Sequence, residues 1–506
     1  MLAKEISYRI DRLYERFRMD GITDSLTFVE QISYLLLLRF RDEISKENTP
    51  NYHFPPRNVL FKVQSEAWKA IESARRSERI SVIENCIRNI ESYDRTFPGI
   101  FTNATFIVES QNTLDEALDL VNGIFDYFGE RKDIRQLMGD IYDYLLSKMT
   151  LMPGNGELFT PRTLTKLMVE LISPNGSDII CDPACGTGGF LVYVNKHIKE
   201  IYKNRLNKET SNTFTGIDTN PRMVRIAQLN MIFNEVEKAV IENKNLLYDF
   251  DKAQKYSIVI SNPPIGAEMS IGNIDSTLDT NNSHLVFIER IMSLLDKYGK
   301  CTVLVPEGFL YNSSSAHTEI RRRLLNEFRV HGIVSLPNGV FLPYTNAKAS
   351  ILVFGRINSI GTIPYTEKVW FYEVTEDWNA LNGKMLTNSE SEIFTDLLMR
   401  WEKREEDYSK WDGLLKSENS EKVEKGENRI FAPSKWDIPQ IWFAQYGNIE
   451  SNNYKLNAAF YKPQSVNEKE YEDPQDVLRE VLVMEENVIS KIKALLEETQ
   501  SYEKNL

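Results

Sequence analysis

Apolar residues recur every three or four positions through roughly the first 150 residues, which predicts a helical region at residues 1–150. A second amphipathic set follows Asp24-Ser25, a typical helix-start signal. Strand-helix alternation is not evident in this part of the sequence. The first amphipathic set consists of Ile6, Ile10, Leu13 and Phe17. The Pro/Gly-rich stretch 150–156 then predicts a domain boundary.

The hydrophobic pattern changes between residues 151 and 395, where short β-branched runs alternate with amphipathic stretches. This alternation predicts an α/β domain with a mostly parallel sheet and helices on both faces. Ligands of such sheets bind at the carboxyl ends of the strands. The predicted strands are 179–181, 213–217, 258–261, 301–305, 330–335, 349–354 and 368–372. The predicted helices are 189–201, 222–234, 285–296 and 316–328.

The chain beyond residue 395 divides into two further parts. Residues 396–472 are predicted to form a charged extension, in which 396–430 carry dense charges of mixed sign and suit a solvated surface helix or loop. The stretch 430–442 then turns apolar and aromatic again. Residues 473–506 predict a helix, because Asp473 supplies a cap and Pro474 suits a first helical turn. Its apolar stripe suits a partner subunit or the chain's own domain, and it comprises Leu478, Leu482, Ile489, Ile492 and Leu496.

Composition limits the class of protein. With 42% hydrophobic and 26% charged residues, the sequence is typical of a soluble globular protein. The longest apolar run, 34–38, is too short for a membrane span, and no signal peptide is evident. Four cysteines and five histidines show no metal-ligand spacing, and the thiols suit a cytoplasmic location. The net charge of −13 argues against a protein that grips nucleic acid alone, although a basic partner could make DNA a substrate.

A glycine-rich loop follows the first predicted strand of the α/β domain. Its residues are Asp182, Pro183, Ala184, Cys185, Gly186, Thr187, Gly188 and Gly189. The glycines permit close approach of a ligand to the backbone, and the next helix directs its amides at the loop. Neither the G-x-G-x-x-G of dinucleotide-binding proteins nor a P-loop lysine is present. Asp218 ends the next strand, where its carboxylate could bind a ribose diol, cap a helix or do both.

A second loop, Asn262-Pro263-Pro264-Ile265, follows another predicted strand. The lone pair of a base amine is delocalised into the ring, so methyl transfer to this amine needs hydrogen-bond acceptors on its protons. The Asn262 side chain and the Pro263 carbonyl can supply them, and two prolines hold the turn in place. Asn-Pro can also be a simple strand-to-turn stop. Together with the upstream glycine loop, the turn favours a catalytic role.

With these motifs in this order, the chain resembles the modification subunit of type I restriction-modification systems, an S-adenosylmethionine-dependent adenine-N6 DNA methyltransferase. The resemblance covers nearly the whole chain. Its motifs are 156–162, 182–190, Asp218, 262–264, 305–310 and 336–341.

The resemblance implies a Rossmann-like methyltransferase core with a helical N-terminal domain and a helical C-terminal tail. It implies that the 182–190 loop holds the methionine part of S-adenosylmethionine, that Asp218 holds its ribose, and that Asn262 and Pro263 bind the adenine amine. It further implies DNA as substrate, a separate specificity subunit, a restriction helicase-nuclease subunit and two copies of this chain per complex. The residues implied to contact cofactor just before the core are Glu157, Leu158, Phe159, Thr160, Pro161 and Arg162.

Two positions depart from the family pattern. Ile265 stands where an aromatic residue usually stacks on the flipped base, so Phe309 or Phe341 could substitute. Asn245 stands near the position of an acid that usually contacts the cofactor adenine. The alternatives are a catalytically weak or inactive cofactor-binding subunit and a protein glutamine methyltransferase, which also uses Asn-Pro-Pro. The run 321–323 of three arginines is read as a solvated helix face.

Overall fold

The structure is a computed structural model of the 506-residue chain. It describes residues 4–46, 67–93, 100–128, 134–151, 160–203, 210–264, 274–342, 347–357, 364–375, 392–424, 433 and 436–463. The chain forms two compact units, Met1–Gly413 with Asp437–Lys462 and Leu414–Trp436 with Pro463–Leu506. The described residues of the predicted site all belong to the first unit. None of the described helices is long and apolar enough to cross a membrane.

The described part of the first 151 residues is helical, as predicted. The helices are α1 (Lys4–Met19), α2 (Ser25–Lys46), α3 (Ala67–Ser73), α4 (Arg79–Tyr93), α5 (Gln111–Phe128) and α6 (Ile134–Ser147), with 3₁₀ turns at Arg76–Glu78 and Lys148–Leu151. Asp24 starts α2, since its carboxylate accepts the amides of Leu26 (3.1 Å) and Thr27 (3.2 Å). The buried rings of Phe17 and Phe28 meet edge to face at 5.0 Å.

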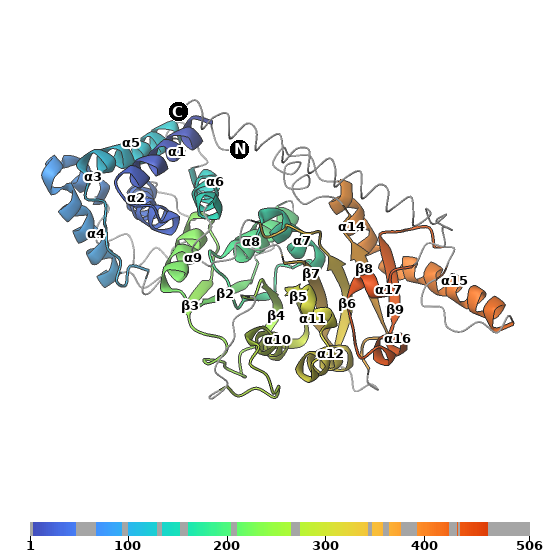
Figure 1. The fold of residues 1–506 in the computed structure, drawn as a ribbon. Coiled ribbons are helices and arrows are strands. Elements are labelled where there is room, and N and C mark those ends of the chain that lie inside the picture. The colour runs from blue at the N-terminus through green and yellow to red at the C-terminus, as the bar shows by residue number, and fades with distance from the viewer. Residues whose placement is uncertain are drawn as a thin grey trace, which may run out of the picture. The chain divides into compact units, whose positions relative to one another are not determined.

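One sheet forms the centre of the α/β core, with the strand order β3-β2-β1-β4-β5-β7-β6-β8-β9 among the described residues (Figure 1). The strands are β1 (Ile179–Asp182), β2 (Thr213–Asp218), β3 (Ala239–Asn243), β4 (Tyr256–Ser261), β5 (Leu295–Pro306), β6 (Phe328–Ser335), β7 (Ala349–Arg356), β8 (Lys368–Glu373) and β9 (Ile441–Gln445). The strands β1 to β5 pair in parallel, as do β6 and β8. The other pairings, β5–β7, β6–β7 and β8–β9, are antiparallel. The predicted mostly parallel α/β core is therefore confirmed.

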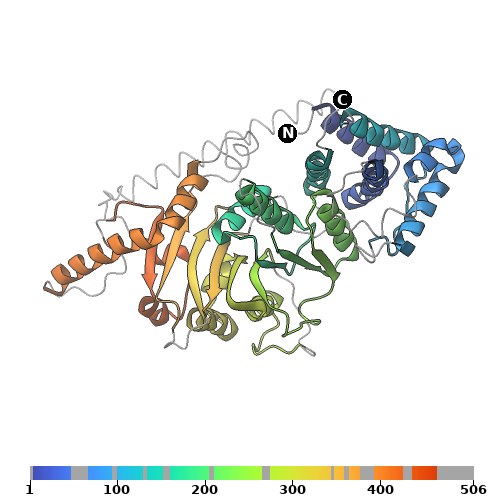
Figure 2. The same cartoon turned by 180° about the vertical axis from the view of Figure 1, so that it is seen from behind.

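Helices cover both faces of the sheet (Figures 1 and 2). One face carries α7 (Arg162–Ile172), α8 (Gly189–Tyr202) and α9 (Pro221–Phe233), and the other carries α10 (Ser283–Leu294) and α12 (Ser315–Glu327). The ends of α8, α9, α10 and α12 lie within two residues of the predicted ends. The remaining helices are α11 (Glu307–Tyr311), α14 (Glu392–Glu402), α15 (Arg404–Glu424), α16 (Tyr446–Ser451) and α17 (Ala458–Tyr461).

The sheet continues past residue 395, because β9 lies within the predicted charged extension 396–472, at the end of its apolar stretch 430–442. The side chains of Trp442 and Phe443 in β9 are buried, and the indole N–H of Trp442 donates to the Ala458 carbonyl at 3.0 Å. Burial of these aromatic rings on the sheet outweighs the charge of the surrounding sequence.

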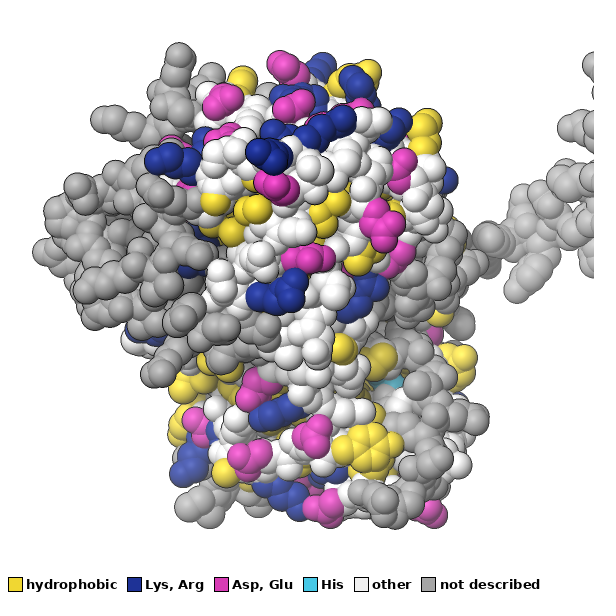
Figure 3. Space-filling model, turned by 90° about the vertical axis from the view of Figure 1, so that its left-hand side faces the viewer, with side chains coloured by type: hydrophobic (Ala, Val, Ile, Leu, Met, Phe, Trp, Pro, Cys, Tyr) yellow, Lys and Arg dark blue, Asp and Glu magenta, His cyan; other side chains and the backbone are white. Residues whose placement is uncertain are grey.

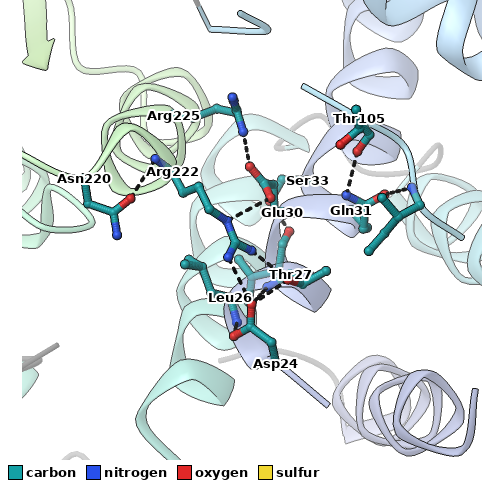
Figure 4. A network of polar contacts seen from close by, with 12 residues as sticks. Asp24, Leu26, Thr27, Glu30, Gln31, Ser33, Thr105, Asn220, Arg222 and Arg225 are labelled. Carbon is teal, nitrogen blue, oxygen red and sulfur yellow. Dashed lines mark hydrogen bonds and ion pairs between the residues drawn. The ribbon is translucent and has the colours of Figure 1, made fainter. Parts of the chain in front are cut away.

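An arginine of α9 binds the helical region to the core. Arg225 pairs with Glu30 of α2, and both side chains are less than 10% exposed (Figure 4). The remaining guanidinium hydrogen bonds go to the Tyr34 hydroxyl (3.1 Å) and to the carbonyls of Ile100 (2.9 Å) and Thr102 (2.7 Å). The buried charge is therefore both paired and hydrogen-bonded, the condition under which a protein tolerates it.

A second arginine, one turn earlier in α9, extends this contact. Arg222 lies 3.1 Å from Asp24 and 3.3 Å from Glu30, and it donates to the Thr27 hydroxyl at 2.7 Å (Figure 4). The cap of α9, Asn220, accepts the backbone amide of Arg222 at 2.9 Å. The contact with α2 thus begins in the first turn of α9, at Arg222, four residues after Asp218.

Candidate active site

The predicted cofactor loop, residues 182–189, connects the carboxyl end of β1 to the start of α8. The amide of Cys185 donates to the carbonyl of Ile217 in β2 at 2.9 Å. The carbonyl of Thr187 accepts the side-chain amide of Asn230 in α9 at 2.8 Å. The core therefore fixes the loop from two sides before any ligand binds.

Asp182, the first residue of this loop, is fully buried. Its Oδ1 accepts hydrogen bonds from the amide of Ala184 (3.2 Å) and from the hydroxyl of Ser261 (2.9 Å), while its Oδ2 has no partner among the described residues. Burial raises the pKa of Asp182 to about 7 against the opposing effect of these hydrogen bonds. Because Ser261 precedes Asn262, this contact ties the glycine loop directly to the Asn-Pro-Pro turn.

The glycines of the loop are required by its shape. Gly186 and Gly188 have φ values of +51° and +77°, which other residues adopt at a cost. A Cβ on Gly188 would lie 2.6 Å from the methyl carbon of Met231 in α9, whereas a Cβ on Gly186 or Gly189 would meet no atom of the described residues within 4 Å. The loop is thus tightly packed against α9 and leaves space for a ligand at Gly186 and Gly189.

Asp218 lies at the carboxyl end of β2, beside this space. Its carboxylate accepts the amide of Gly186 at 2.9 Å and the amide of Asn220 at 2.8 Å, and burial raises its pKa. The helix-cap role belongs to Asn220, so Asp218 is not the cap of α9. A carboxylate offers about four acceptor sites, so further lone pairs are available for ribose hydroxyls.

Asn262 follows β4 and presents an unused acceptor. Its Nδ2 donates to the hydroxyl of Thr160 at 3.1 Å, while its buried Oδ1 has no partner among the described residues. Thr160 thereby fixes the orientation of the amide. Since Thr160 comes from the segment 156–162, the structure brings together three segments that the sequence singled out.

The other predicted site residues lie in varied surroundings. Pro161 precedes the first turn of α7, and Arg162 donates to the Asp143 carbonyl of α6, toward the helical region. Asn245 accepts the amide of Leu247 at 3.0 Å in a turn after β3. Pro263 is buried and Pro264 is exposed. Outside the described residues lie Glu157, Leu158, Phe159, Ile265 and the stripe at 478–496.

Neither ring offered as a substitute for Ile265 presents a free face. Phe309 and Phe341 are each 1% exposed, and Phe309 packs edge to face on the buried ring of His284, with 5.8 Å between centroids. Burial lowers the pKa of His284 to about 4, so this ring is neutral at physiological pH.

The reading of 321–323 as a solvated helix face is wrong for Arg321, whose side chain is buried. Its guanidinium binds backbone carbonyls inside the core. Arg322 pairs with Glu319 on the same helix (2.7 Å), and Arg323 pairs with the buried Glu289 of α10 (2.9 Å).

Sequence reasoning missed two residues that position the loops, Ser261 and Asn230. Each is a polar residue in an otherwise apolar element, and each is at most 1% exposed. A buried polar side chain needs a hydrogen-bond partner, so a serine or asparagine inside an apolar strand or helix indicates an internal hydrogen bond. The identity of the partner, Asp182 or Thr187, depends on the fold.

A mostly parallel sheet with a glycine loop after β1, an acid at the end of β2 and Asn-Pro-Pro after β4 is typical of a methyltransferase that modifies base amines. The chain belongs to the N-6 DNA methylase family, whose model matches residues 133–470. Among known proteins, it is 29% identical over 390 residues to the type I restriction enzyme EcoEI methylase subunit of Escherichia coli, covering 73% of this chain and 77% of that protein. It is 25% identical over 380 residues to the EcoKI methylase subunit of E. coli K12, covering 70% and 68%.

Two solved structures share the fold over almost the full length. One comes from work on complex assembly and conformational transition of the type I R-M system, with a TM-score of 0.67, 23% identity and coverage of 98% of this chain and 99% of that one. The other is the type I restriction-modification methyltransferase subunit of Streptococcus thermophilus, with a TM-score of 0.63, 14% identity and coverage of 91% and 99%. The predicted class, an adenine-specific DNA methyltransferase similar to type I modification subunits, is confirmed.

Proposed function

We propose that this chain transfers a methyl group from S-adenosylmethionine to the N6 amine of adenine in duplex DNA, as the cytoplasmic modification subunit of a type I restriction-modification complex. The observation that carries the proposal is the Asn262 side chain. Its oxygen is a buried acceptor with no partner among the described residues, and Thr160 holds the amide in that orientation. A buried acceptor left open is costly unless a ligand uses it.

The described residues fit S-adenosylmethionine, which supplies an electrophilic methyl group when bound. The open space at Gly186 and Gly189 suits the methionine part. Gly188 caps α8 without a side-chain hydrogen bond, so the first amides of the helix remain available to a carboxylate. Asp218 has acceptor sites for a ribose diol.

Asn262 and Pro263 would act on the adenine amine. The Asn262 oxygen and the Pro263 carbonyl would accept hydrogen bonds from the two N–H groups of the amine. These hydrogen bonds favour tetrahedral character at nitrogen and stabilise the positive charge that develops there. S-adenosylmethionine would supply the methyl group, and the amine would release one proton to solvent. The target base reaches these acceptors only after it leaves the helix.

The proposed partners follow from charge and from the family. The chain carries a net charge of −13, so like charges oppose its approach to DNA. On the face drawn in Figure 3, basic and acidic side chains of the described residues are interspersed. We therefore propose that a specificity subunit supplies the DNA-binding surface, with two copies of this chain and a restriction helicase-nuclease subunit completing the complex. The stripe at 478–496 is the proposed docking segment.

The decisive experiment compares Asn262→Ala with Asn262→Asp in the complex assembled with the specificity subunit. Loss of the acceptor in Asn262→Ala should lower methyl transfer by about 100- to 1,000-fold, as for other removed transition-state hydrogen bonds. Asn262→Asp keeps an acceptor and should retain more activity. Cofactor affinity, measured by calorimetry, should stay nearly constant in both variants. Wild-type turnover by Asn262→Ala would refute the catalytic assignment.

Sequence-specific methylation by the isolated chain at physiological salt would refute the proposed dependence on a specificity subunit. A gel-shift assay on the same samples measures DNA binding directly. We expect weak binding or none for the isolated chain and tight binding for the complex.

A further inference from the structure

A flipped base is normally held by stacking on an aromatic ring, and the described rings first considered for this role are buried. Phe309 and Phe341 are each 1% exposed. Two residues after Phe309, however, Tyr311 is 49% exposed. The two residues share the short helix α11, which buries the first ring and presents the second to solvent.

The register of the sheet places α11 at the catalytic edge. In the pairing of β4 with β5, Ser261 lies opposite Val303. Asn262 leaves β4 directly after this pair, and β5 ends three residues beyond it at Pro306, where α11 begins (Figure 1). Neighbouring strands lie about 4.8 Å apart, so Asn262 and α11 leave the same edge of the sheet from adjacent positions.

Other exposed aromatic side chains of the described residues lie elsewhere. Tyr248 follows β3, which is three strands from β4, and Tyr298 lies near the amino end of β5. Phe460 belongs to α17, and Tyr8 and Tyr127 belong to the helical region. Among them, Tyr311 alone continues from the carboxyl end of a strand next to β4.

The turn that carries Tyr311 is held from within the core by Arg321. This guanidinium is 0% exposed and donates to the carbonyls of Phe309, Asn312 and Tyr454, each at 2.8 Å. The amide of Leu456 also donates to the Leu310 carbonyl at 2.8 Å. Burying an arginine on carbonyl acceptors is costly, and here it fixes the backbone on both sides of Tyr311. The ring is thus an exposed group on an immobilised turn, which is the arrangement of a preorganised contact.

We infer that Tyr311 is the stacking surface for the flipped adenine, with Arg321 as the residue that positions it. The inference rests on the proposed function and supplies the aromatic contact that Ile265 cannot provide. Base–aromatic stacking tolerates sequence variation, since every base has a π-face, so this contact captures the target and leaves sequence reading to another subunit.

The test uses Tyr311→Ala and Tyr311→Phe in the assembled complex, on duplex DNA that contains the target adenine. Loss of one stacked ring should lower kcat/KM for DNA by about 5- to 150-fold in Tyr311→Ala, while Tyr311→Phe stays within about twofold of wild type. A mismatch opposite the target adenine lowers the cost of flipping, so it should restore part of the activity of Tyr311→Ala. Cofactor affinity should not change, because Tyr311 acts on the base.

The matched control is Tyr298→Ala, which removes a 67% exposed tyrosine from the opposite end of β5 and should leave kcat/KM unchanged. Wild-type kcat/KM in Tyr311→Ala would overturn the inference. So would a Tyr311→Phe variant as impaired as Tyr311→Ala, because the hydroxyl would then be the active group. Loss of assembly with the specificity subunit, seen by size-exclusion chromatography, would assign Tyr311 to a subunit interface instead.

The two proposals fail separately. If the wild-type complex methylates adenine and Asn262→Ala abolishes this activity while Tyr311→Ala does not reduce it, only the stacking role fails. If the wild-type complex leaves adenine unmethylated, the proposed function itself is wrong.

Discussion

The ion pair between Arg225 and Glu30 should contribute far more to stability than an ion pair on the surface. Both side chains are less than 10% exposed, so removal of Glu30 leaves the desolvated Arg225 guanidinium without its carboxylate, and removal of Arg225 leaves Glu30 with only the longer ion pair to Arg222 at 3.3 Å. The expected cost of Glu30→Ala or Arg225→Ala is about 3–5 kcal/mol. A cycle with the double variant should give a coupling energy of about 1.5–3 kcal/mol, because each single variant already loses the buried ion pair.

A surface pair in the same helical region provides the control. Glu84 and Arg88 of α4 lie 3.2 Å apart, and their side chains are 38% and 67% exposed. Their coupling energy should be about 0.3–0.5 kcal/mol and should decrease in concentrated salt. Urea unfolding of the isolated chain, followed by circular dichroism, measures both cycles.

The pattern of unfolding offers a second readout. Because Arg225 joins α9 to α2 and to the 100–102 turn, the helical region of the single variants should unfold at lower urea than the α/β core, giving two transitions. A coupling energy for Arg225 and Glu30 no larger than that of the surface pair would refute the reasoning, since burial would then have no energetic consequence.

Four further changes test the site and the assembly. Asp182 binds its proton more tightly in the folded state, with a pKa of about 7 against 3.8, so stability should fall as pH rises from about 4 to about 7, and Asp182→Asn should flatten this slope in thermal melts. Gly188→Ala should cost about 1–3 kcal/mol, because the residue has positive φ and a methionine of α9 blocks the new methyl group, whereas Gly413→Ala in α15 should be neutral or stabilising in the same melts. Ile265→Phe should equal or exceed wild type in base capture, measured by KM for DNA. Deletion from residue 474 onward should impair assembly with the specificity subunit, seen by size exclusion, more than it impairs cofactor binding.

The sequence predicted the elements whose hydrophobic period is regular. All seven predicted strands and four core helices appear in the structure, because burial on one or both faces leaves a clear pattern. The glycine loop, Asp218 and Asn262 were singled out from sequence because each follows a predicted strand directly, and the structure places each at the carboxyl end of its strand; their roles remain predictions. These features depend on neighbours within a few residues along the chain.

Features that depend on distant contacts were not predictable in this way. The pairing of Asp182 with Ser261 joins residues 79 positions apart. The strand β9 was not predicted, because the dense charge of 396–430 dominated the interpretation of this part of the chain, although the stretch 430–442 is apolar and aromatic. The burial of Arg321 had a local signal, because Leu324 and Leu325 lie three and four positions further along the same helix face. The run of three arginines obscured that signal, since arginine is rarely buried.

The last strand of the sheet has a consequence for solubility. Without β9, the strand β8 would become an edge with a row of unpaired backbone groups, and Phe371 would lose its stacking contact with Trp442. Such an edge pairs readily with another copy of the chain and promotes aggregation. Tyr461 stacks on Phe371, with 5.6 Å between centroids, so the protective segment extends at least to that residue. A shortened version of this enzyme that is to remain dispersed in solution must therefore end beyond Tyr461, even though the motifs of the active site end some 120 residues earlier.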